Sequence, residues 1–184
     1  MRPAEHVAAP IALTVLITPR LVLRAFASTD IDRVAELVGD FEVVRNLARV
    51  PWPYGREQAR EFVVEIAPTE TVWAIVQRQD NLLVGAIGLT PGDTPELGYW
   101  IGRPHWGQGF ATEAGAAVLR HAFVAHATET LTSGYFTDNP ASGRVLMKLG
   151  FVPTGFAERP CLARGAPQAS CEMRLDRGAQ PTWI

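Results

Sequence analysis

The alternation of apolar and polar residues near the start of the chain predicts a strand followed by a helix. Leu21 to Arg24 predicts the first strand. Thr29, with Asp32 three residues later, resembles a capping box and predicts the start of the helix. The apolar side chains that recur at helical spacing are Ile31, Val34, Leu37 and Val38.

A proline-rich segment separates this helix from a second one. Residues 50–55 cannot form a regular helix or a central strand, because the two prolines have no backbone N–H to donate. The second helix is expected from Arg56 to Ile66. Its inward-facing residues are predicted to be Ala59, Phe62, Val63 and Ile66.

The middle of the chain predicts neighbouring strands. Val72 to Val76 and Leu82 to Leu89 are joined by the polar residues Gln77 to Asn81, which is typical of a hairpin. After a turn at residues 91–93, Glu96 to Gly102 predicts a further strand.

A glycine-rich junction then introduces the longest predicted helix. Gly107 and Gly109 are expected to open a helix that runs to about Ala127. Its inward stripe is Ala111, Ala114, Val118, Ala122 and Ala125.

The last third of the chain again predicts strands with a helix between them. Leu131 to Phe136 predicts a strand, and Asn139 with Pro140 predicts the cap and first residue of a short helix that ends at Gly150. Two closing strands are expected at Phe151 to Glu158 and Ser170 to Leu175. These elements predict one α/β domain over residues 18–176, with an N-terminal tail or edge segment at 1–17 and a C-terminal tail at 177–184.

Composition and charge narrow the class of protein. The chain has 184 residues, 47% of them apolar and 20% charged, with a net charge of -2 and a pI of about 6.1. These values predict a globular domain and give no global electrostatic case for binding nucleic acid. The two cysteines, Cys161 and Cys171, supply neither a disulfide framework nor a four-ligand zinc site. We therefore expect reduced thiols in the cytoplasm and no bound metal.

The apolar run at the N-terminus can be compared with a signal peptide and with a membrane-spanning segment. His6 to Ile17 has some features of a signal peptide, but Pro10 interrupts it and it is too short to span a bilayer. We expect a soluble protein with no membrane partner.

The glycine junction is the sharpest chemical feature of the sequence. A strand leads into Gly107-x-Gly109 and a helix begins at once, so free N–H groups and the helix dipole can attract a phosphate. The chain lacks both the P-loop pattern and the third glycine of the dinucleotide fingerprint. What remains is an anion-binding turn or, alternatively, a tight turn without a ligand.

Four stretches, in order, resemble the GNAT superfamily of N-acetyltransferases, and within it the ribosomal-protein alanine/serine acetyltransferase-like branch. The stretches are Thr18 to Arg24, Glu96 to Gly102, Trp106 to Glu113 and Asn139 to Phe151. The resemblance covers residues 18–175. It implies a mixed, mostly antiparallel central sheet flanked by helices, with a splayed pair of strands holding acetyl-CoA.

The resemblance also assigns residues to the acetyl-CoA co-substrate. The loop after the splayed strand would present backbone amides to the pyrophosphate, a backbone N–H near Tyr99 or Trp100 would bond the acetyl carbonyl, and Asn139 would bond the pantetheine arm. Arg144 and Lys148 are solvated helix residues that could reach the ribose phosphate of CoA. With them, the full set is Tyr99, Trp100, Ile101, Trp106, Gly107, Gln108, Gly109, Phe110, Ala111, Thr112, Asn139, Arg144 and Lys148.

The chain departs from the superfamily at two positions. Pro104 stands where relatives usually have Gln or Arg, three residues before the first glycine of the loop. Leu146 stands where many relatives have a tyrosine that acts as general acid, and a leucine cannot donate a proton.

Two other side chains are therefore the candidates for proton transfer. Glu96 shares a strand face with Trp100, where partial desolvation would suit a general base; the alternative is a solvated glutamate at the start of a strand. Ser142 resembles the serine of this branch that hydrogen-bonds the departing sulfur, although it equally suits the start of a helix. Tyr99 and Tyr135 are fallback donors.

The resemblance favours a protein N-terminal amine, with a ribosomal protein as one candidate, as the acceptor in a ternary complex. A small-molecule amine of the aminoglycoside or polyamine type, and a non-catalytic acyl-CoA sensor, are the alternatives. Trp52, Tyr54 and the loop Cys161 to Arg164 are expected to wall the acceptor cleft. Relatives in the family suggest a monomer or a homodimer.

Overall fold

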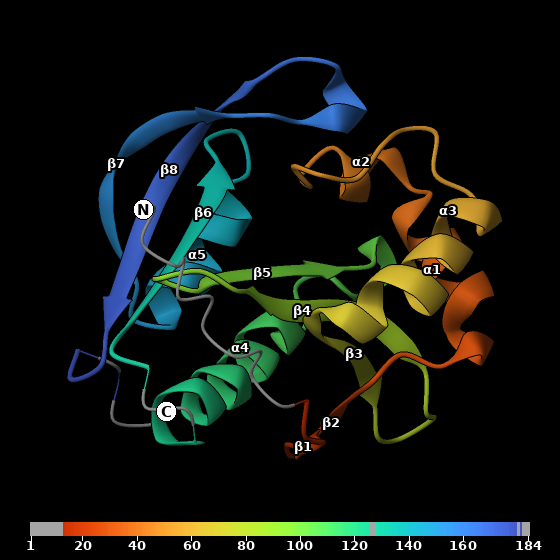
Figure 1. Ribbon diagram of the computed structural model, residues 1–184, viewed down its shortest axis with the longest axis horizontal. Helices are drawn as coiled ribbons and strands as arrows, with labels where there is room; N and C mark the ends of the chain where they lie inside the picture. The colour runs from red at the N-terminus through yellow and green to blue at the C-terminus, as the bar shows by residue number, and fades with distance from the viewer. Residues whose placement is uncertain (1–12, 126–127, 180, 182–184) are drawn as a thin grey trace, which may run out of the picture.

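The computed structural model describes residues 13–125, 128–179 and 181, and these form one mixed sheet with helices against both faces (Figure 1). The predicted tail residues 1–12, the expected helix end at Ala127 and most of the last five residues lie outside the described part of the chain. The eight strands follow the order β1-β2-β3-β4-β5-β6-β8-β7. Neighbouring strands are antiparallel except β5 and β6, which are parallel.

The strands agree closely with the predicted apolar runs. They are β1 Leu16–Ile17, β2 Leu21–Arg24, β3 Thr71–Gln77, β4 Leu83–Thr90, β5 Glu96–Ile101, β6 Thr130–Phe136, β7 Val152–Arg159 and β8 Gln168–Asp176. β1 lies in the segment 1–17, which the sequence predicts as a tail or an edge, and it pairs with β2 at one edge of the sheet.

The helices are short, and two of them continue into π-helical turns. They are α1 Ile31–Val38, α2 Phe41–Val44, α3 Arg56–Glu61 with the π-helical turn Phe62–Ile66, α4 Phe110–Arg120 with the π-helical turn His121–Ala125, and α5 Pro140–Lys148. Gly150, at φ +92°, ends the last of them as predicted. Within the described residues, no helix combines the length and the apolar character that crossing a bilayer requires.

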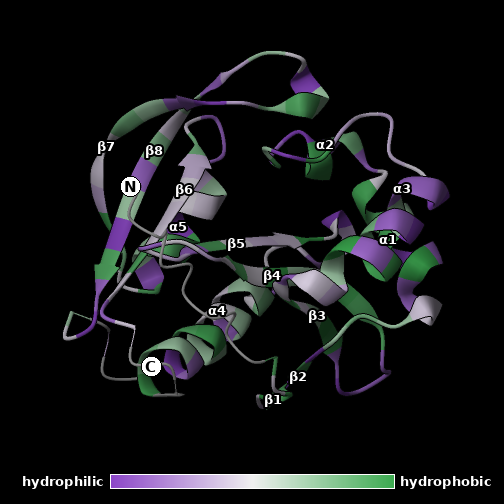
Figure 2. Ribbon diagram, in the orientation of Figure 1, coloured by the Kyte–Doolittle hydropathy of each residue, from purple (hydrophilic) through white to green (hydrophobic). Residues whose placement is uncertain are grey.

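The sheet separates two hydrophobic cores. Side chains of α4 and α5 pack with one face of the central strands, and side chains of α1 and α3 pack with the other. The alternation predicted for β5 is confirmed, since Leu97, Tyr99 and Ile101 contact the first core and Trp100 the second. In Figure 2 the ribbons of β3 and β4 are mostly hydrophobic and that of α3 is largely hydrophilic, so α3 adds little more than Ala59 to the core.

Two local predictions are wrong. Thr29 does not cap α1, because it lies inside a 3₁₀ turn, and the carboxylate of Asp30 instead accepts from the backbone N–H of Ala27 at 2.8 Å. Ile66 is not inward but 39% exposed. The π-helical turn changes the number of residues per turn, so the 3.6-residue period no longer predicts which side chains face the core.

The pairing between β5 and β6 determines where the functional site lies. The two strands share the single pair Glu96 and Thr132, and then separate. Beyond that pair β5 follows β4 as far as Ile101, whereas β6 follows β8 as far as Phe136. The predicted splayed pair of strands is therefore present.

Candidate active site

A cavity of about 600 Å³ opens where β5 and β6 separate. Its lining comes from both faces of the sheet: from β5, the glycine loop and α5, and from the segment 46–50 after α2. Every predicted site residue except Gln108 lines it. The cavity therefore joins the side of the sheet covered by α4 and α5 to the opposite side.

The glycine loop has the geometry of an anion-binding turn. Gly107 and Gly109 have φ of +72° and +80°, a backbone region that favours glycine. The first amide bonded within the α4 turn is that of Glu113, which donates to the carbonyl of Gly109 at 3.0 Å. The amides of Phe110, Ala111 and Thr112 precede it and have no helical acceptor, so they remain available to a phosphate.

Side chains of the loop itself and one arginine from near the start of the chain hold this loop in place. Trp106 Nε1 donates to the carbonyl of Ile101 at 2.6 Å, and the Arg20 guanidinium donates to the carbonyl of Gln108 at 2.9 Å. The side chain of Gln108 lies outside the cavity and donates to Pro104 O at 3.3 Å. Trp106 and Gln108 therefore also stabilise the shape of the loop.

Glu113 connects the start of the chain to the same turn. Its carboxylate accepts from Thr18 Oγ1 at 2.6 Å and from Arg20 Nε at 2.6 Å. Burial acts to raise the pKa of Glu113, but the hydrogen bonds from Thr18 and Arg20 outweigh it and hold the pKa below its usual value. Thr18 and Glu113 are 95 positions apart, so this connection could not be seen from local sequence patterns.

The register of β5 determines which backbone groups face the opening. The N–H of Gly102 donates to Val84 O in β4 at 2.8 Å. Trp100, which pairs with Ala86, lies two residues before Gly102, so its N–H points in the same direction. The N–H of Trp100 therefore points to β4, whereas that of Tyr99 points toward the gap. Of the two expected positions, Tyr99 is the one that can offer a backbone donor to an acyl carbonyl.

A tyrosine and a serine meet on the α5 side of the cavity. The Tyr99 hydroxyl lies 2.7 Å from Ser142 Oγ. Burial raises the pKa of Tyr99 to about 12, so its phenol remains protonated at neutral pH. Leu146, in the position of the missing family tyrosine, is fully buried in the core.

The start of α5 carries the remaining residues expected to contact acetyl-CoA. Asn139 caps the helix, because its side-chain oxygen accepts from the Ser142 N–H at 3.3 Å. This geometry leaves the amide NH₂ of Asn139 beside the cavity. Arg144 and Lys148, one and two turns further along, are exposed and line the cavity on the same helix.

On the opposite side of the sheet, Glu96 belongs to an ionic network. Arg159, at the end of β7, donates to the carboxylates of both Glu96 and Glu172. These hydrogen bonds lower the pKa of Glu172. A Cβ at Gly134 would lie 3.1 Å from Arg159 Cζ, so a glycine leaves room for the guanidinium over β6. Neither Arg159 nor Glu172 was found from the sequence, because neither lies in a recognisable motif.

The Ser170 hydroxyl lies close to this network. Ser170 is fully buried, and its oxygen has no hydrogen-bond partner of normal geometry within the described residues. Glu172 is nevertheless near enough for the hydroxyl to contribute to the lowering of its pKa. The contact between Ser170 and Glu172 is therefore a weak one.

A second ionic group shapes the wall contributed by residues 46–50. Asp138 accepts from Arg45 at 3.0 Å and from Arg164 at 2.7 Å, and the Arg164 hydrogen bond lowers its pKa. Arg164 Nε also donates to the backbone carbonyl of Arg45 at 2.8 Å. These contacts fix the segment that follows α2.

The expected aromatic walls of the acceptor cleft are not where the sequence placed them. Trp52 packs edge-on against Phe41 with ring centroids 5.2 Å apart, Tyr54 packs in the core beside α1, and neither lines the cavity. The 161–164 loop instead supports the wall from outside, where the Leu162 N–H donates to Ala48 O at 3.1 Å.

Comparisons with known proteins agree with this geometry. The sequence profile described as Acetyltransferase (GNAT) domain matches residues 20–152. The uncharacterized N-acetyltransferase YoaA of Bacillus subtilis (strain 168) is 29% identical over 168 residues, covering 83% of this chain and 91% of that protein. The prophage-derived uncharacterized N-acetyltransferase YokL of the same organism is 30% identical over 159 residues, covering 84% and 89%.

Other similarities are partial or confined to the fold. The ribosomal-protein-serine acetyltransferase of Escherichia coli (strain K12) is 32% identical over 81 residues, 42% of this chain and 45% of that protein. A GNAT-family acetyltransferase from Bacillus anthracis superposes with a TM-score of 0.80 at 21% identity, covering 89% of this chain and 98% of that one. Spermidine N-acetyltransferase from Vibrio cholerae, in complex with CoA and spermine, gives 0.74 at 18% identity, covering 88% and 98%. The chain therefore belongs to the GNAT acetyltransferase family and is an acetyl-CoA-dependent N-acetyltransferase.

Proposed function

We propose that this acetyltransferase acylates the N-terminal amine of a peptide or protein by direct attack in a ternary complex. The observation that carries the proposal is the cavity between β5 and β6, which has the free amides of α4 on one side of the sheet and the Glu96 carboxylate on the other. Such a cavity brings a thioester and an amine together from opposite sides, which makes their reaction effectively intramolecular.

On the α4 side, the residues fit acetyl-CoA. The amides of Phe110, Ala111 and Thr112 would bind the pyrophosphate, and the NH₂ of Asn139 would bind the pantetheine arm. The Tyr99 N–H would hold the acyl carbonyl and stabilise the negative charge that develops on its oxygen. Arg144 and Lys148 would supply positive charge near the phosphates.

The departing thiolate needs a proton, and the Tyr99–Ser142 pair can provide one. Ser142 Oγ would donate to the sulfur as the carbon–sulfur bond breaks, while the Tyr99 hydroxyl donates to Ser142. This arrangement compensates for Leu146, because the phenol comes from β5 rather than from α5. The non-catalytic sensor suggested by the missing tyrosine thus loses its main support.

The amine must lose a proton as the new carbon–nitrogen bond forms. Glu96 would accept it, directly or through a water molecule. Its carboxylate is held by Arg159 and is 39% exposed, so Arg159 would act as a positioning residue that orients the base. The second oxygen of Glu96 accepts no hydrogen bond from the described residues and is free to face the amine.

The charges at the acceptor mouth support a peptide rather than a polycation. Glu96, Glu172 and Asp138 are each paired with an arginine. Glu70 also lines the cavity, but one further carboxylate is poorly suited to bind several ammonium groups. The partial similarity to the ribosomal-protein-serine acetyltransferase also supports a protein acceptor, and a ribosomal protein is one candidate. A small-molecule amine is the competing outcome.

Two measurements test the proposal. Calorimetry with acetyl-CoA should show binding, and thiol release should then depend on an acceptor chosen from amidated peptides, spermidine and an aminoglycoside. Release with peptides alone would support the proposal. Release only with spermidine or the aminoglycoside would overturn the peptide assignment, and failure to bind acetyl-CoA would overturn the assigned site.

A further inference from the structure

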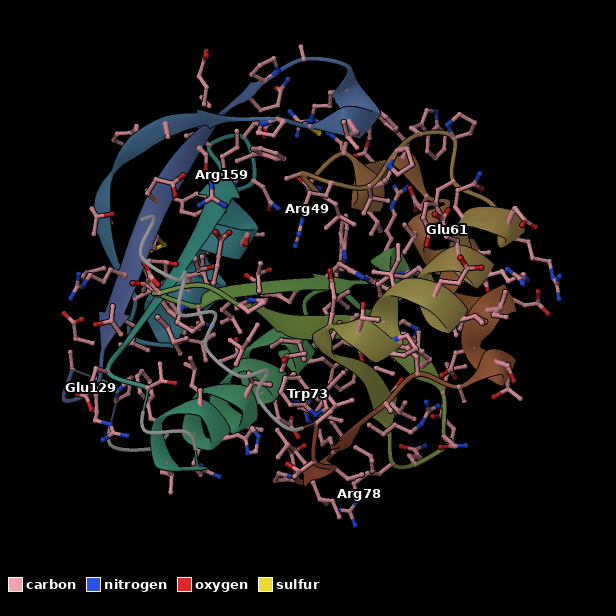
Figure 3. All side chains as sticks on the ribbon, in the orientation of Figure 1. Arg49, Glu61, Trp73, Arg78, Glu129 and Arg159 are labelled. Carbon is pink, nitrogen blue, oxygen red and sulfur yellow. The ribbon has the colours of Figure 1, made fainter. Side chains whose placement is uncertain are left out.

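Arg49 differs from the other arginines around the acceptor mouth. It follows α2, is exposed and lines the cavity. Figure 3 shows its side chain pointing from the α2 side toward β5, with Arg159 on the other side of the same space. Its one hydrogen bond among the described residues is from Nη2 to Thr90 Oγ1, at 3.1 Å.

The other arginines of the mouth are already neutralised. Arg159 is paired with two carboxylates, and Arg45 and Arg164 share Asp138. In the described part of the chain, no carboxylate forms an ion pair with Arg49. Glu70 lines the same cavity and forms no ion pair with Arg49. A guanidinium has five N–H donors, so most of those on Arg49 are available to a ligand.

The position of Arg49 relative to the proposed base is fixed by the sheet. Thr90, which accepts from Arg49, is the direct cross-strand partner of Glu96 in the β4–β5 ladder. Directly opposed side chains share one face of a sheet, roughly 5 Å apart at Cα. The free guanidinium therefore lies within about one or two residues' length of the carboxylate that would accept the amine proton.

Building on the proposed function, we propose that Arg49 binds a carboxylate of the acceptor, and that the substrate is an amine with an acidic group one or two residues away. An unpaired guanidinium binds a carboxylate through two parallel N–H donors. It has no acceptor for an ammonium group and repels its positive charge. A peptide with an acidic side chain after its first residue fits this geometry.

A matched set of substrates tests the inference. The probes are three amidated peptides that differ at their second position, Ser-Asp, Ser-Asn and Ser-Lys, together with free serine and serinamide. For the wild-type enzyme we expect kcat/KM to favour Ser-Asp over Ser-Asn by about tenfold, mainly through KM. In Arg49→Gln this ratio should fall to about one, and Arg49→Glu should favour the Ser-Lys peptide.

A control and the remaining outcomes separate this inference from the proposed function. Arg56→Gln changes an exposed arginine of α3 outside the cavity lining, and it should keep the wild-type ratio. Equal turnover of Ser-Asp and Ser-Asn by the wild-type enzyme, or a ratio that survives in Arg49→Gln, would overturn the role of Arg49 while leaving peptide acetylation intact. A third outcome is that Arg49 favours serine over serinamide but makes no difference among the peptides. This result would support carboxylate binding by Arg49 and would overturn the peptide acceptor.

Discussion

The two sides of the cavity are built in different ways. On the acetyl-CoA side, the loop and the start of α4 form one continuous stretch, 103–112, whose anion-binding geometry comes from two glycines and a helix end. On the acceptor side, the contacts join residues far apart in the sequence, such as Arg159 with Glu96 and Arg45 with Asp138. The proposed acetyl-CoA side thus relies mainly on the backbone geometry of one local stretch, which Arg20 supports from near the start of the chain. The proposed acceptor side relies on long-range side-chain pairs.

The largest effect is expected from a substitution in the glycine loop, where acetyl-CoA is proposed to bind. Gly107→Val places a β-branched side chain at φ +72° and should weaken acetyl-CoA binding on the order of 100-fold, because strain and lost amide contacts add together. Calorimetry measures the Kd. Gly155→Val is the control, since Gly155 lies in open space without a positive φ and should leave binding unchanged. An unaltered Kd in Gly107→Val would show that the loop does not hold the phosphates.

The Tyr99–Ser142 pair connects the two sides and should show the next largest effect. Tyr99→Phe and Ser142→Ala should each lower kcat roughly 10- to 100-fold with little change in acetyl-CoA affinity, because the donor acts as charge develops on sulfur. The double variant should be little worse than either single variant, since the two hydroxyls act as one unit. Stopped-flow thiol release measures both. Fully additive losses would contradict a shared role.

A smaller effect is expected when the acceptor network is broken. Arg159→Met should lower kcat/KM about tenfold, since Glu96 loses its orienting partner. Removing positive charge beside two carboxylates should also move the acidic limb of the pH–rate profile to higher pH. Arg159→Lys should restore part of both. A fall in activity with an unshifted pH profile would indicate a purely structural role.

The smallest effect concerns stability against acid. Arg159 and Arg164 lower the pKa values of Glu172 and Asp138, and Thr18 and Arg20 lower that of Glu113. Each carboxylate therefore stabilises the fold above its unfolded pKa of about 4, and loses that contribution as pH falls through the lower folded pKa.

Urea titrations at pH 7 and pH 3 measure this difference. These groups are partly exposed, so after screening we expect less than about 1 kcal/mol from each. In Glu113→Gln the free energy of unfolding should fall less between pH 7 and pH 3 than in the wild type. The difference between the two falls is the contribution of the Glu113 carboxylate. Greater stability at pH 3 than at pH 7 would contradict the sign.

The difference between the two sides also explains what the sequence could predict. The strands, the glycine turn and the Asn139 cap depend on neighbours within a few residues, and each was found from spacing and residue type. The sequence around Arg49 and Arg159 gave no such signal, because the role of each arginine depends on whether a carboxylate pairs with it in the folded protein. Trp52 was misassigned for a related reason: an exposed aromatic residue in a proline-rich segment does not reveal which neighbour it packs against.

By itself the sequence determined the mixed α/β fold, the turn at Gly107 and Gly109 and the resemblance to acetyltransferases, since hydrophobic period, glycine conformation and helix capping act over short distances. Only the tertiary structure decided that Tyr99 meets Ser142, that Glu96 is held by Arg159 and that Arg49 has no acidic partner within the described chain. Those contacts form when strands and loops from distant parts of the sequence come together, and the register of the sheet determines which side chains meet.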